Sequence, residues 1–298
     1  MRSISTLVVA LASVYVAGAA QNELQEVTNF TAGPTGAKMY IYVPTTKPCL
    51  APIVVGIHYC SGTAAQYFTN TQYANLADDK GFIVIYPEAP SSGRCWDVAS
   101  TASLTNGQGG DSQTIVNMVD YAVKNYGGDP DRVFVTGTSS GAMMTNVLAG
   151  AYPNIFKAAS AYSGVPDGCF AVAGAAAGSD TPGWNSECSS GKSIKSAQDW
   201  GDLARSYYPG YTGPRPKMMI WHGDQDTILA YPNLAETLKQ WSNVLDVAFT
   251  KNTTDTPESG YTEMMYGDGT KLLGYSAKGV GHTVPVHATV DLAWFGIE

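Results

Sequence analysis

Residues 133–142 of the chain read Val133-Phe134-Val135-Thr136-Gly137-Thr138-Ser139-Ser140-Gly141-Ala142. A β-branched and aromatic run, typical of a buried strand, leads into Gly-x-Ser-x-Gly, and a helix-forming run to residue 149 follows it. This order predicts a sharp turn from strand to helix that presents Ser139 as a nucleophile. Gly137 and Gly141 stand two residues on either side of that serine, so they fix the register and leave room for strand and helix to approach.

Ser140 has a different predicted role, because it begins the helix. The first N–H groups of a helix have no partner within it and can hold an anionic oxygen. We therefore expect the Ser140 N–H to be one donor of an oxyanion hole. The plain alternative is a turn rich in Gly and Ser, since a five-residue pattern alone often occurs by chance.

The segments around this stretch predict an α/β fold. Continuous apolar runs at 52–57, 82–86 (closed by Pro87), 156–162 and 218–221 are typical of strands buried in a parallel sheet. An opening hairpin is expected at 26–31 and 39–43, and late strands at 247–250, 262–266 and 272–277. Helices are expected at 64–79, 112–125 (capped by Asp111), 142–149, 233–244 and 287–294. This alternation predicts a single domain with a mostly parallel central sheet flanked by helices.

Residues 1–20 have the pattern of a secretory signal peptide. A charged start precedes an apolar run at 7–16, and small residues follow at 17–20. No later stretch has the ~20 apolar residues that a membrane helix needs. We therefore expect a secreted protein, with residues 21–298 as its single domain and no membrane association.

The charge of the chain narrows the class of partner. Its formal net charge is −8, and only 14% of its residues are charged. An acidic protein is a poor ligand for nucleic acid or anionic membranes, both of which require basic surfaces. A neutral or weakly charged substrate fits better, and no obligate protein partner is evident.

The cysteines and sequons also agree with secretion. Five cysteines lie in the mature region without zinc-ligand spacing, so disulfides are expected. Cys169 and Cys188 flank a loop rich in Gly, Ala and Ser and are the favoured pair. Two of the remaining three are expected to pair, with Cys60–Cys95 preferred. The N-glycosylation sequons are Asn29-Phe30-Thr31 and Asn252-Thr253-Thr254.

A serine hydroxyl needs a histidine base, which a carboxylate in turn orients. In α/β-hydrolases the chain order is Ser, then Asp or Glu, then His, each after a strand. His282 follows the last predicted strand and is the candidate base; the other three histidines are expected to be structural or part of loops. Asp224 and Asp226 follow the strand at 218–221, and spacing alone does not choose between them.

The loop after the strand at 52–57 reads His58-Tyr59-Cys60-Ser61-Gly62. α/β-Hydrolases place the second oxyanion donor at this position. The candidate is a backbone N–H near Cys60, with Ser61 less favoured. A loop tethered by a disulfide is the alternative, and both can hold because the donor belongs to the backbone.

Five motifs occur in order along the chain: His58-x-Cys60, Asp129-Pro130-Asp131-Arg132-Val133, Gly137-Thr138-Ser139-Ser140-Gly141, His222-Gly223-x-x-Asp226 and Gly281-His282-Thr283-Val284-Pro285. Together they resemble the secreted esterase/polyhydroxybutyrate-depolymerase family, which overlaps carbohydrate esterase family one. Within it, the chain is most similar to the fungal acetylxylan esterases, over nearly the whole mature region. The resemblance implies that Asp226 is the acid. The wider family often has glycine where this chain has Tyr59.

The resemblance implies a secreted serine esterase that removes acetyl groups from xylan polysaccharide or oligosaccharide, without a metal or cofactor. Trp96, Trp184 and Trp221 are candidates to stack on sugars, although they can equally be core residues. Feruloyl esterases and polyhydroxybutyrate depolymerases share the motifs and are alternatives. A peptidase of the same fold or a binding module without catalysis is less favoured, because the triad residue types occur in order.

Overall fold

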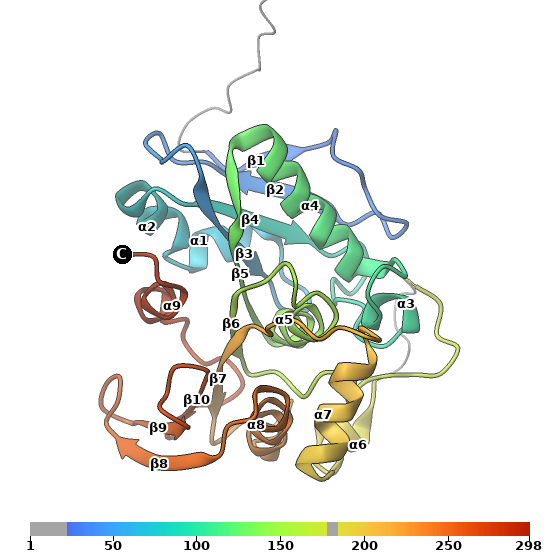
Figure 1. Ribbon diagram of the computed structural model, residues 1–298, viewed down its shortest axis with the longest axis vertical. Helices are drawn as coiled ribbons and strands as arrows, with labels where there is room; N and C mark the ends of the chain where they lie inside the picture. The colour runs from blue at the N-terminus through green and yellow to red at the C-terminus, as the bar shows by residue number, and fades with distance from the viewer. Residues whose placement is uncertain (1–22, 178–183) are drawn as a thin grey trace, which may run out of the picture.

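The structure, a computed structural model, describes residues 23–177 and 184–298. The predicted signal peptide at 1–20 lies outside the described residues. A ten-stranded sheet runs through the molecule in the order β1-β2-β4-β3-β5-β6-β7-β10-β9-β8 (Figure 1). The strands are β1 (Gln25–Val27), β2 (Lys38–Tyr42), β3 (Ala51–Ile57), β4 (Ile83–Glu88), β5 (Gly128–Thr138), β6 (Ala158–Tyr162), β7 (Lys217–Gly223), β8 (Phe249–Thr254), β9 (Tyr261–Tyr266) and β10 (Leu272–Ala277).

The centre of the sheet is parallel and its edges are antiparallel. Strands β4, β3, β5, β6, β7 and β10 run in one direction, whereas β1, β2, β8 and β9 add antiparallel ribbons at the two edges. This arrangement confirms the predicted mostly parallel sheet. The helices are α1 (Ala64–Asn70), α2 (Tyr73–Lys80), α3 (Thr101–Leu104), α4 (Gly110–Tyr126), α5 (Ser140–Ala151), α6 (Ser186–Ser189), α7 (Ala197–Ser206), α8 (Pro232–Leu245) and α9 (Ala288–Phe295).

Helices cover both faces of the sheet (Figure 1). Helices α4, α5 and α8 lie on one face and α1, α2 and α9 on the other. Successive strand residues alternate between two cores: Ile53 and Val55 pack on the first face, and Val54 packs on the second. Since both faces are buried, the central strands read as continuous apolar runs in the sequence.

Several boundaries differ from their predictions. The opening strand expected at 26–31 already ends at Val27, and the strand expected at 247–250 is β8, Phe249–Thr254. The helix expected at 64–79 is two helices, because the chain turns at Thr71 and Gln72 between α1 and α2. The strand expected to end before Pro87 continues to Glu88. Pairing with β3 stops at Ile85, so the N–H that proline lacks is not needed there, while the antiparallel pairing with β2 continues.

The predicted cap of helix α4 is wrong. The N-cap is Gly109, at φ +103°, and Asp111 lies inside the first helical turn. The buried Asp111 carboxylate instead accepts the N–H of Asp97, at 2.9 Å. A side chain on Gly110 would meet the Ser103 backbone at 2.6 Å, so close packing decides where this helix begins.

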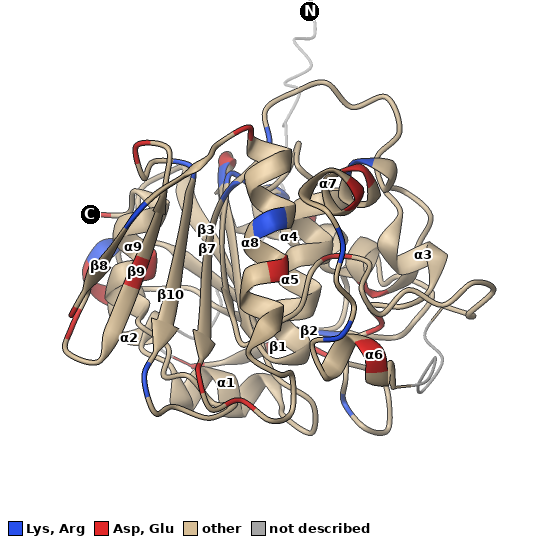
Figure 2. Cartoon of the chain, turned by 90° about the horizontal axis from the view of Figure 1, so that it is seen from below, with Lys and Arg blue, Asp and Glu red and all other residues tan. Residues whose placement is uncertain are grey.

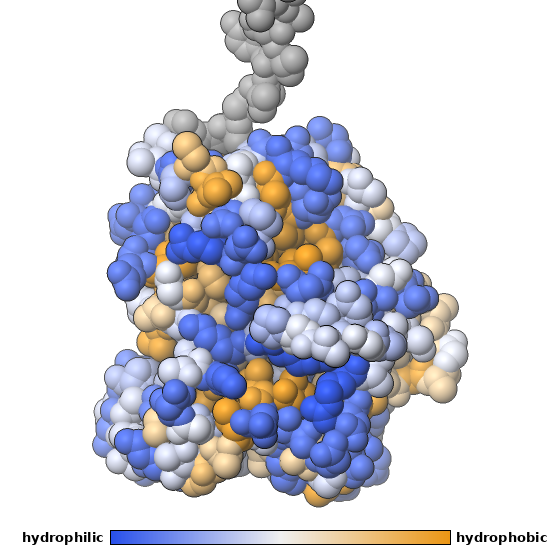
Figure 3. Space-filling view, in the orientation of Figure 1, coloured by the Kyte–Doolittle hydropathy of each residue, from blue (hydrophilic) through white to orange (hydrophobic). Residues whose placement is uncertain are grey.

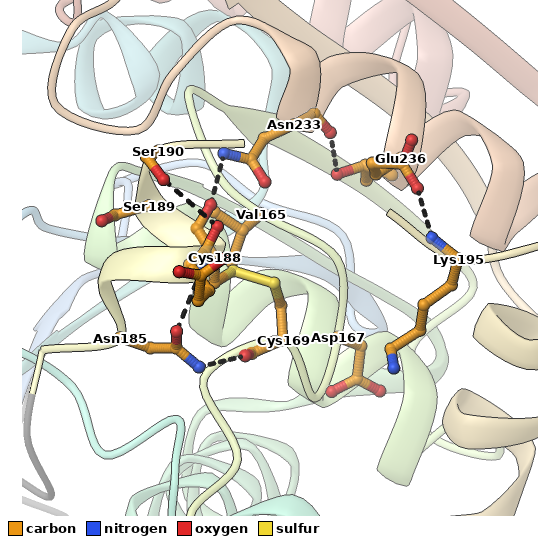
Figure 4. The surroundings of a disulfide bond; sticks show 12 residues. Val165, Asp167, Cys169, Asn185, Cys188, Ser189, Ser190, Lys195, Asn233 and Glu236 are labelled. Atoms are coloured by element: carbon orange, nitrogen blue, oxygen red, sulfur yellow. Dashed lines mark hydrogen bonds between the residues drawn. A yellow bond between two sulfur atoms is a disulfide. The ribbon is translucent and has the colours of Figure 1, made fainter. Parts of the chain in front are cut away.

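The Cys169–Cys188 disulfide fixes a long connection onto helix α8 (Figure 4). The Asn185 side chain donates to the Cys169 carbonyl at 3.0 Å and accepts the Cys188 N–H at 3.0 Å. From α8, Asn233 donates to the Cys188 carbonyl at 3.0 Å. These contacts hold the segments that carry two aromatic side chains of the cavity described below.

The surface is polar with few charges. Figure 2 shows Lys and Arg spread over separate helices, strands and loops. In Figure 3 most of the visible face is hydrophilic, interrupted by small apolar patches. Both sequon asparagines, Asn29 and Asn252, are exposed. Within 23–177 and 184–298, no helix combines the length and the apolar character required to cross a bilayer.

Candidate active site

Ser139 is the single residue between strand β5 and helix α5, and its backbone conformation is strained. Its φ is +57° and its ψ is −118°, outside the regions that non-glycine residues ordinarily adopt. Its N–H donates to the carbonyl of Tyr162 on the neighbouring strand β6, at 2.8 Å. Strain of this kind is sustained only where the surroundings fix the backbone. The turn therefore has the geometry predicted for a nucleophile elbow.

The two flanking glycines are required by close backbone contacts. A Cβ on Gly137 would lie 2.4 Å from the Gly141 carbonyl oxygen. A Cβ on Gly141 would lie 2.1 Å from the carbonyl oxygen of Ile57 and 2.7 Å from that of His58. The second contact places the end of β3 directly against the start of α5. The Gly-x-Ser-x-Gly spacing therefore brings the His58–Gly62 loop beside the elbow.

Ser139, His282 and Asp226 form a continuous hydrogen-bonded line. His282 Nε2 lies 2.8 Å from Ser139 Oγ, and His282 Nδ1 lies 2.8 Å from Asp226 Oδ2. The other carboxylate oxygen, Asp226 Oδ1, accepts the N–H groups of Ile228 at 2.9 Å and Leu229 at 3.0 Å. The structure thus brings together the three side chains that the sequence nominated for a triad.

Asp226 is buried and held in its ionised form. Burial by itself would raise the pKa of this carboxyl, but hydrogen bonds from His222 and His282 outweigh it and hold the pKa well below its usual range. His222 Nε2 lies 3.1 Å from Asp226 Oδ2 and 2.7 Å from the Leu229 carbonyl oxygen. An ionised Asp226 accepts the Nδ1–H of His282, which leaves Nε2 free to accept the proton of Ser139.

Asp224 has a separate place in the site. Its Oδ1 accepts the N–H of Gly279 at 2.7 Å and the side-chain amide of Gln225 at 3.1 Å. Gly279 begins the loop that carries His282. Asp224 therefore fixes the base of the histidine loop, while Asp226 contacts the imidazole. Sequence spacing left these two carboxylates open, and the family resemblance indicated Asp226.

His222 is a contributor that the sequence analysis undervalued. The sequence predicts a structural or loop histidine, and its ring does contact the Leu229 carbonyl in the same loop. Its contact with the Asp226 carboxylate was not anticipated. The spacing His222-Gly223-x-x-Asp226 was the available signal, because a tight turn of that length returns the carboxylate to the histidine ring.

The two predicted oxyanion donors flank the elbow. Ser140 is the first residue of α5, and its Oγ accepts the backbone N–H of Trp96 at 2.8 Å. In the loop after β3, the Ser61 N–H donates to the Gly93 carbonyl at 2.9 Å, which removes Ser61 as a donor. Among the non-glycine residues of the described chain with positive φ are Ser61 and Ser139, but not Tyr59. Tyr59 therefore needs none of the conformational freedom of a glycine.

A cavity of about 700 Å³ opens beside Ser139 and His282. Its other walls are largely apolar and aromatic, and they come from the loop after β3, helix α1, the segment 95–99, the side chains of Phe170 and Trp184, and the loops after β7 and β10. The lining residues are Tyr59, Cys60, Tyr67, Asn70, Thr71, Cys95, Trp96, Asp97, Val98, Ala99, Thr138, Ser140, Met143, Phe170, Trp184, Ile228, Leu229, Thr283, Val284, Pro285 and Val286.

The three candidate tryptophans have different surroundings. Trp184 is 57% exposed at the cavity and meets Phe170 edge to face. Trp96 lines the cavity but is only 3% exposed. The prediction for Trp221 is wrong: its ring is fully buried, stacks on Tyr275 at 3.9 Å and does not line the cavity. Rings from other segments cover it, namely Tyr162, Tyr261, Tyr275 and His287, and its own strand gives no sign of them.

Both predicted disulfides are present. Cys60 is bonded to Cys95, which joins the loop after β3 to the segment next to Trp96, and Cys169 is bonded to Cys188. Cys49 is free and exposed. Within the described ranges, no group of three or more His, Cys, Asp or Glu side chains is placed to hold a metal ion.

Comparisons with known proteins agree with this geometry. The family model described as esterase PHB depolymerase matches residues 38–260. The probable acetylxylan esterase A of Aspergillus fumigatus is 50% identical over 276 residues, covering 92% of this chain and 73% of the relative. Feruloyl esterase B of Talaromyces funiculosus is 47% identical over 274 residues, covering 92% and 77%.

A solved structure of a related esterase has the same fold as this chain. The acetyl xylan esterase from Aspergillus awamori superimposes with a TM-score of 0.88 at 47% identity, covering 93% of this chain and all of that chain. The predicted α/β-hydrolase fold is therefore confirmed. Since the family match spans most of the chain and two curated relatives are about half identical to it, the chain belongs to the esterase PHB depolymerase family.

Proposed function

We propose that the chain is a serine esterase that hydrolyses the acetyl esters of acetylated xylan. The observation that carries the proposal is the line of 2.8 Å hydrogen bonds from Ser139 through His282 to Asp226 at a strained elbow. The substrate class is supported by relatives named acetylxylan esterase at 49–50% identity. Neither observation alone would carry both the chemistry and the substrate.

The reaction begins with attack of Ser139 Oγ on the acetyl carbonyl carbon. His282 Nε2 takes the hydroxyl proton as the bond forms, and Asp226 stabilises the resulting imidazolium. The N–H groups of Ser140 and Cys60 hold the developing oxyanion, each worth about 3–4 kcal/mol of transition-state stabilisation. The tetrahedral intermediate collapses when His282 returns the proton to the sugar oxygen, and the deacetylated xylan leaves.

The second half of the reaction frees the enzyme. Water attacks the acetyl carbonyl of the Ser139 ester while His282 takes one of its protons. The same two N–H groups hold the second oxyanion. The proton on His282 then returns to Ser139 Oγ as acetic acid departs and ionises to acetate. Apart from this water molecule, these steps use the side chains and backbone of the chain.

The exposed Trp184 is the side chain best placed to contact the sugar. Its ring stands at the cavity with 57% of its surface exposed, in a cavity that also contains Ser139. A flat apolar ring can bury the apolar face of a xylose unit while the sugar hydroxyls stay in water. Trp96 has too little exposed surface for this role.

We further propose that the protein is secreted and that residues 1–20 are its signal peptide, leaving 21–298 as the mature domain. Two disulfides support an oxidising compartment. The sequon residues Asn29 and Asn252 are exposed and accessible to glycosylation. Mass spectrometry of the secreted protein would give its N-terminus and its glycans, and a retained residue 1 would contradict this proposal.

The function is tested by measuring acetate and ferulate released from matched xylan fragments by the purified protein. Acetate with little ferulate is expected. A feruloyl esterase is the second candidate, because the cavity of about 700 Å³ has aromatic and aliphatic walls and a feruloyl esterase is 47% identical. Ferulate as the main product would favour that candidate, and release of neither acid would refute both.

A further inference from the structure

We propose that His58 is a positioning residue that aims the Cys60 N–H at the oxyanion by holding the Tyr59–Cys60 peptide. The inference rests on the proposed esterase function and assigns a role to a buried histidine outside the Ser139–His282–Asp226 line. His58 is the first residue after strand β3, and its side chain is fully buried. Both of its ring nitrogens contact backbone groups, and one of these groups belongs to the peptide that carries the proposed donor.

The contacts of His58 define which nitrogen carries its proton. Nε2 lies 3.1 Å from the backbone nitrogen of Ala89, an N–H that can only donate, so Nε2 must be the acceptor. Nδ1 lies 2.7 Å from the Tyr59 carbonyl oxygen, which can only accept, so Nδ1 must bear the proton. Burial also lowers the pKa of His58, which favours the neutral ring. The ring is therefore a fixed donor toward Tyr59.

Holding the Tyr59 carbonyl also holds the Cys60 N–H. The two groups belong to one planar trans peptide, in which C=O and N–H point in opposite directions. A hydrogen bond that fixes the direction of the oxygen therefore fixes the direction of the N–H. Donation to the carbonyl also polarises the peptide and strengthens its N–H as a donor. His58 thus controls both the aim and the strength of the Cys60 donor.

A second contact acts on the same peptide. The Gly62 N–H donates to the Tyr59 carbonyl oxygen at 3.0 Å, closing a tight turn. A Cβ on Gly62 would lie 2.8 Å from that oxygen and 3.2 Å from His58 Nδ1. Glycine is therefore needed for both donors to reach one carbonyl. Within the described chain, the Cys60 N–H has no protein acceptor, in contrast to those of Ser61 and Gly62.

The start of the loop is anchored to the other oxyanion donor. The indole Nε1–H of Trp96 donates to the His58 carbonyl at 2.9 Å, and the Trp96 backbone N–H donates to Ser140 Oγ at 2.8 Å. The Cys60–Cys95 disulfide joins the same two segments. Trp96, predicted as a sugar platform, therefore links the Cys60 loop to Ser140. With both segments fixed, the remaining freedom is rotation of the Tyr59–Cys60 peptide, which His58 restricts together with the Gly62 N–H.

Two substitutions separate the contacts of His58. In His58→Asn the side-chain amide nitrogen is as many bonds from Cβ as Nδ1, so it can still donate to Tyr59 but cannot reach Ala89. In His58→Gln the terminal amide oxygen matches Nε2, so it can accept the Ala89 N–H but the donor to Tyr59 is lost. His58→Asn leaves the Ala89 N–H without its acceptor, and His58→Gln leaves the Tyr59 carbonyl with the Gly62 N–H alone. Each variant therefore removes one contact of His58, and a merely structural histidine would make the two equivalent.

The experiment measures kcat and KM on p-nitrophenyl acetate, the inhibition constant of phenylboronic acid and the melting temperature, for the wild type and both variants. We expect His58→Gln to lower kcat about 10²-fold, the scale of one oxyanion donor, with little change in KM. Phenylboronic acid, which forms a tetrahedral adduct on a catalytic serine, should bind correspondingly more weakly. His58→Asn should retain kcat within about fivefold, a loss of ~1 kcal/mol in the barrier.

The outcomes separate this inference from the function on which it rests. Equal kcat losses in the two variants, or losses that follow the melting temperature, would overturn the positioning role. A normal kcat in His58→Gln would overturn it as well. No hydrolysis of p-nitrophenyl acetate by the wild-type protein would refute the esterase function, and the inference would fail with it.

Discussion

Replacing Asp226 by asparagine should abolish most of the activity by imposing the wrong tautomer on His282. Asp226 Oδ1 accepts two backbone N–H groups, from Ile228 and Leu229. In Asp226→Asn only the amide oxygen can accept them, so the amide nitrogen must take the place of Oδ2, facing His282 Nδ1. An NH₂ group at that place donates to Nδ1. The proton of His282 then resides on Nε2, which can no longer accept from Ser139.

The expected loss in kcat is about 10⁴-fold, or roughly 5 kcal/mol in the barrier, the scale known for an imidazole held in the wrong tautomer. A second conflict adds to the first, because the Nε2–H of His222 also faces this position, 3.1 Å from Oδ2. KM should change little, since Asp226 is buried and does not line the cavity.

Asp224→Asn is the matched control. In the wild type the Gly279 N–H donates to Asp224 Oδ1 at 2.7 Å, and the amide oxygen of the asparagine can still accept it. The value of kcat should therefore fall less than fivefold, which corresponds to about 1 kcal/mol in the barrier. Both variants are assayed on p-nitrophenyl acetate with their melting temperatures. The reasoning is refuted if Asp226→Asn keeps a tenth of the wild-type kcat, or if both variants lose activity equally.

Three further predictions concern the serine register, sugar stacking and the pH dependence of stability. Ser139→Ala should remove turnover of p-nitrophenyl acetate. Ser140→Ala should keep a measurable part of it, because the backbone N–H of residue 140 remains. The reverse result would contradict the assignment of Ser139 as the nucleophile. Trp184→Ala should raise KM on acetylated xylan severalfold without affecting p-nitrophenyl acetate; equal effects on both substrates would exclude sugar stacking. Burial raises the pKa of Asp291 to about 6, above the ~4 of an unfolded aspartate. Its proton is therefore bound more tightly in the folded state, and this contribution to stability falls as the pH rises from about 4 to 6. Burial also raises the pKa of Asp111 and Asp167, so denaturant titrations should show a shallower slope in Asp291→Asn than in the wild type, and an unchanged slope would contradict this assignment.

Most of the fold could be predicted because its signals are local. The central strands are apolar runs buried on both faces, and the two glycines around Ser139 fix the elbow within five residues. The errors occurred where a distant contact decides the local structure. Pro87 is accepted inside β4 because β3 ends its pairing before it, and α4 begins where Gly110 packs on Ser103.

The residues of the candidate site also divide into those with local sequence signals and those that depend on distant contacts. Ser139, Asp226 and His282 each follow a strand of the parallel part of the sheet, β5, β7 and β10, so chain order was enough to nominate them. Trp221 was misplaced because nothing in its own strand shows that the rings of Tyr275 and His287 cover it. The choice between Asp224 and Asp226 depended on loop contacts, and only the family resemblance favoured one of them.

The orientation of the catalytic groups depends on polar contacts that connect one loop with another. Two backbone N–H groups orient the Asp226 carboxylate, Asp224 holds the start of the histidine loop, and His58 holds the peptide before Cys60. None of these contacts lies within a helix or strand, so neither periodicity nor propensity predicts it. A sheet edge can bring suitable residues together in many sequences. We infer that these polar partners determine whether residues gathered at that edge can stabilise a transition state.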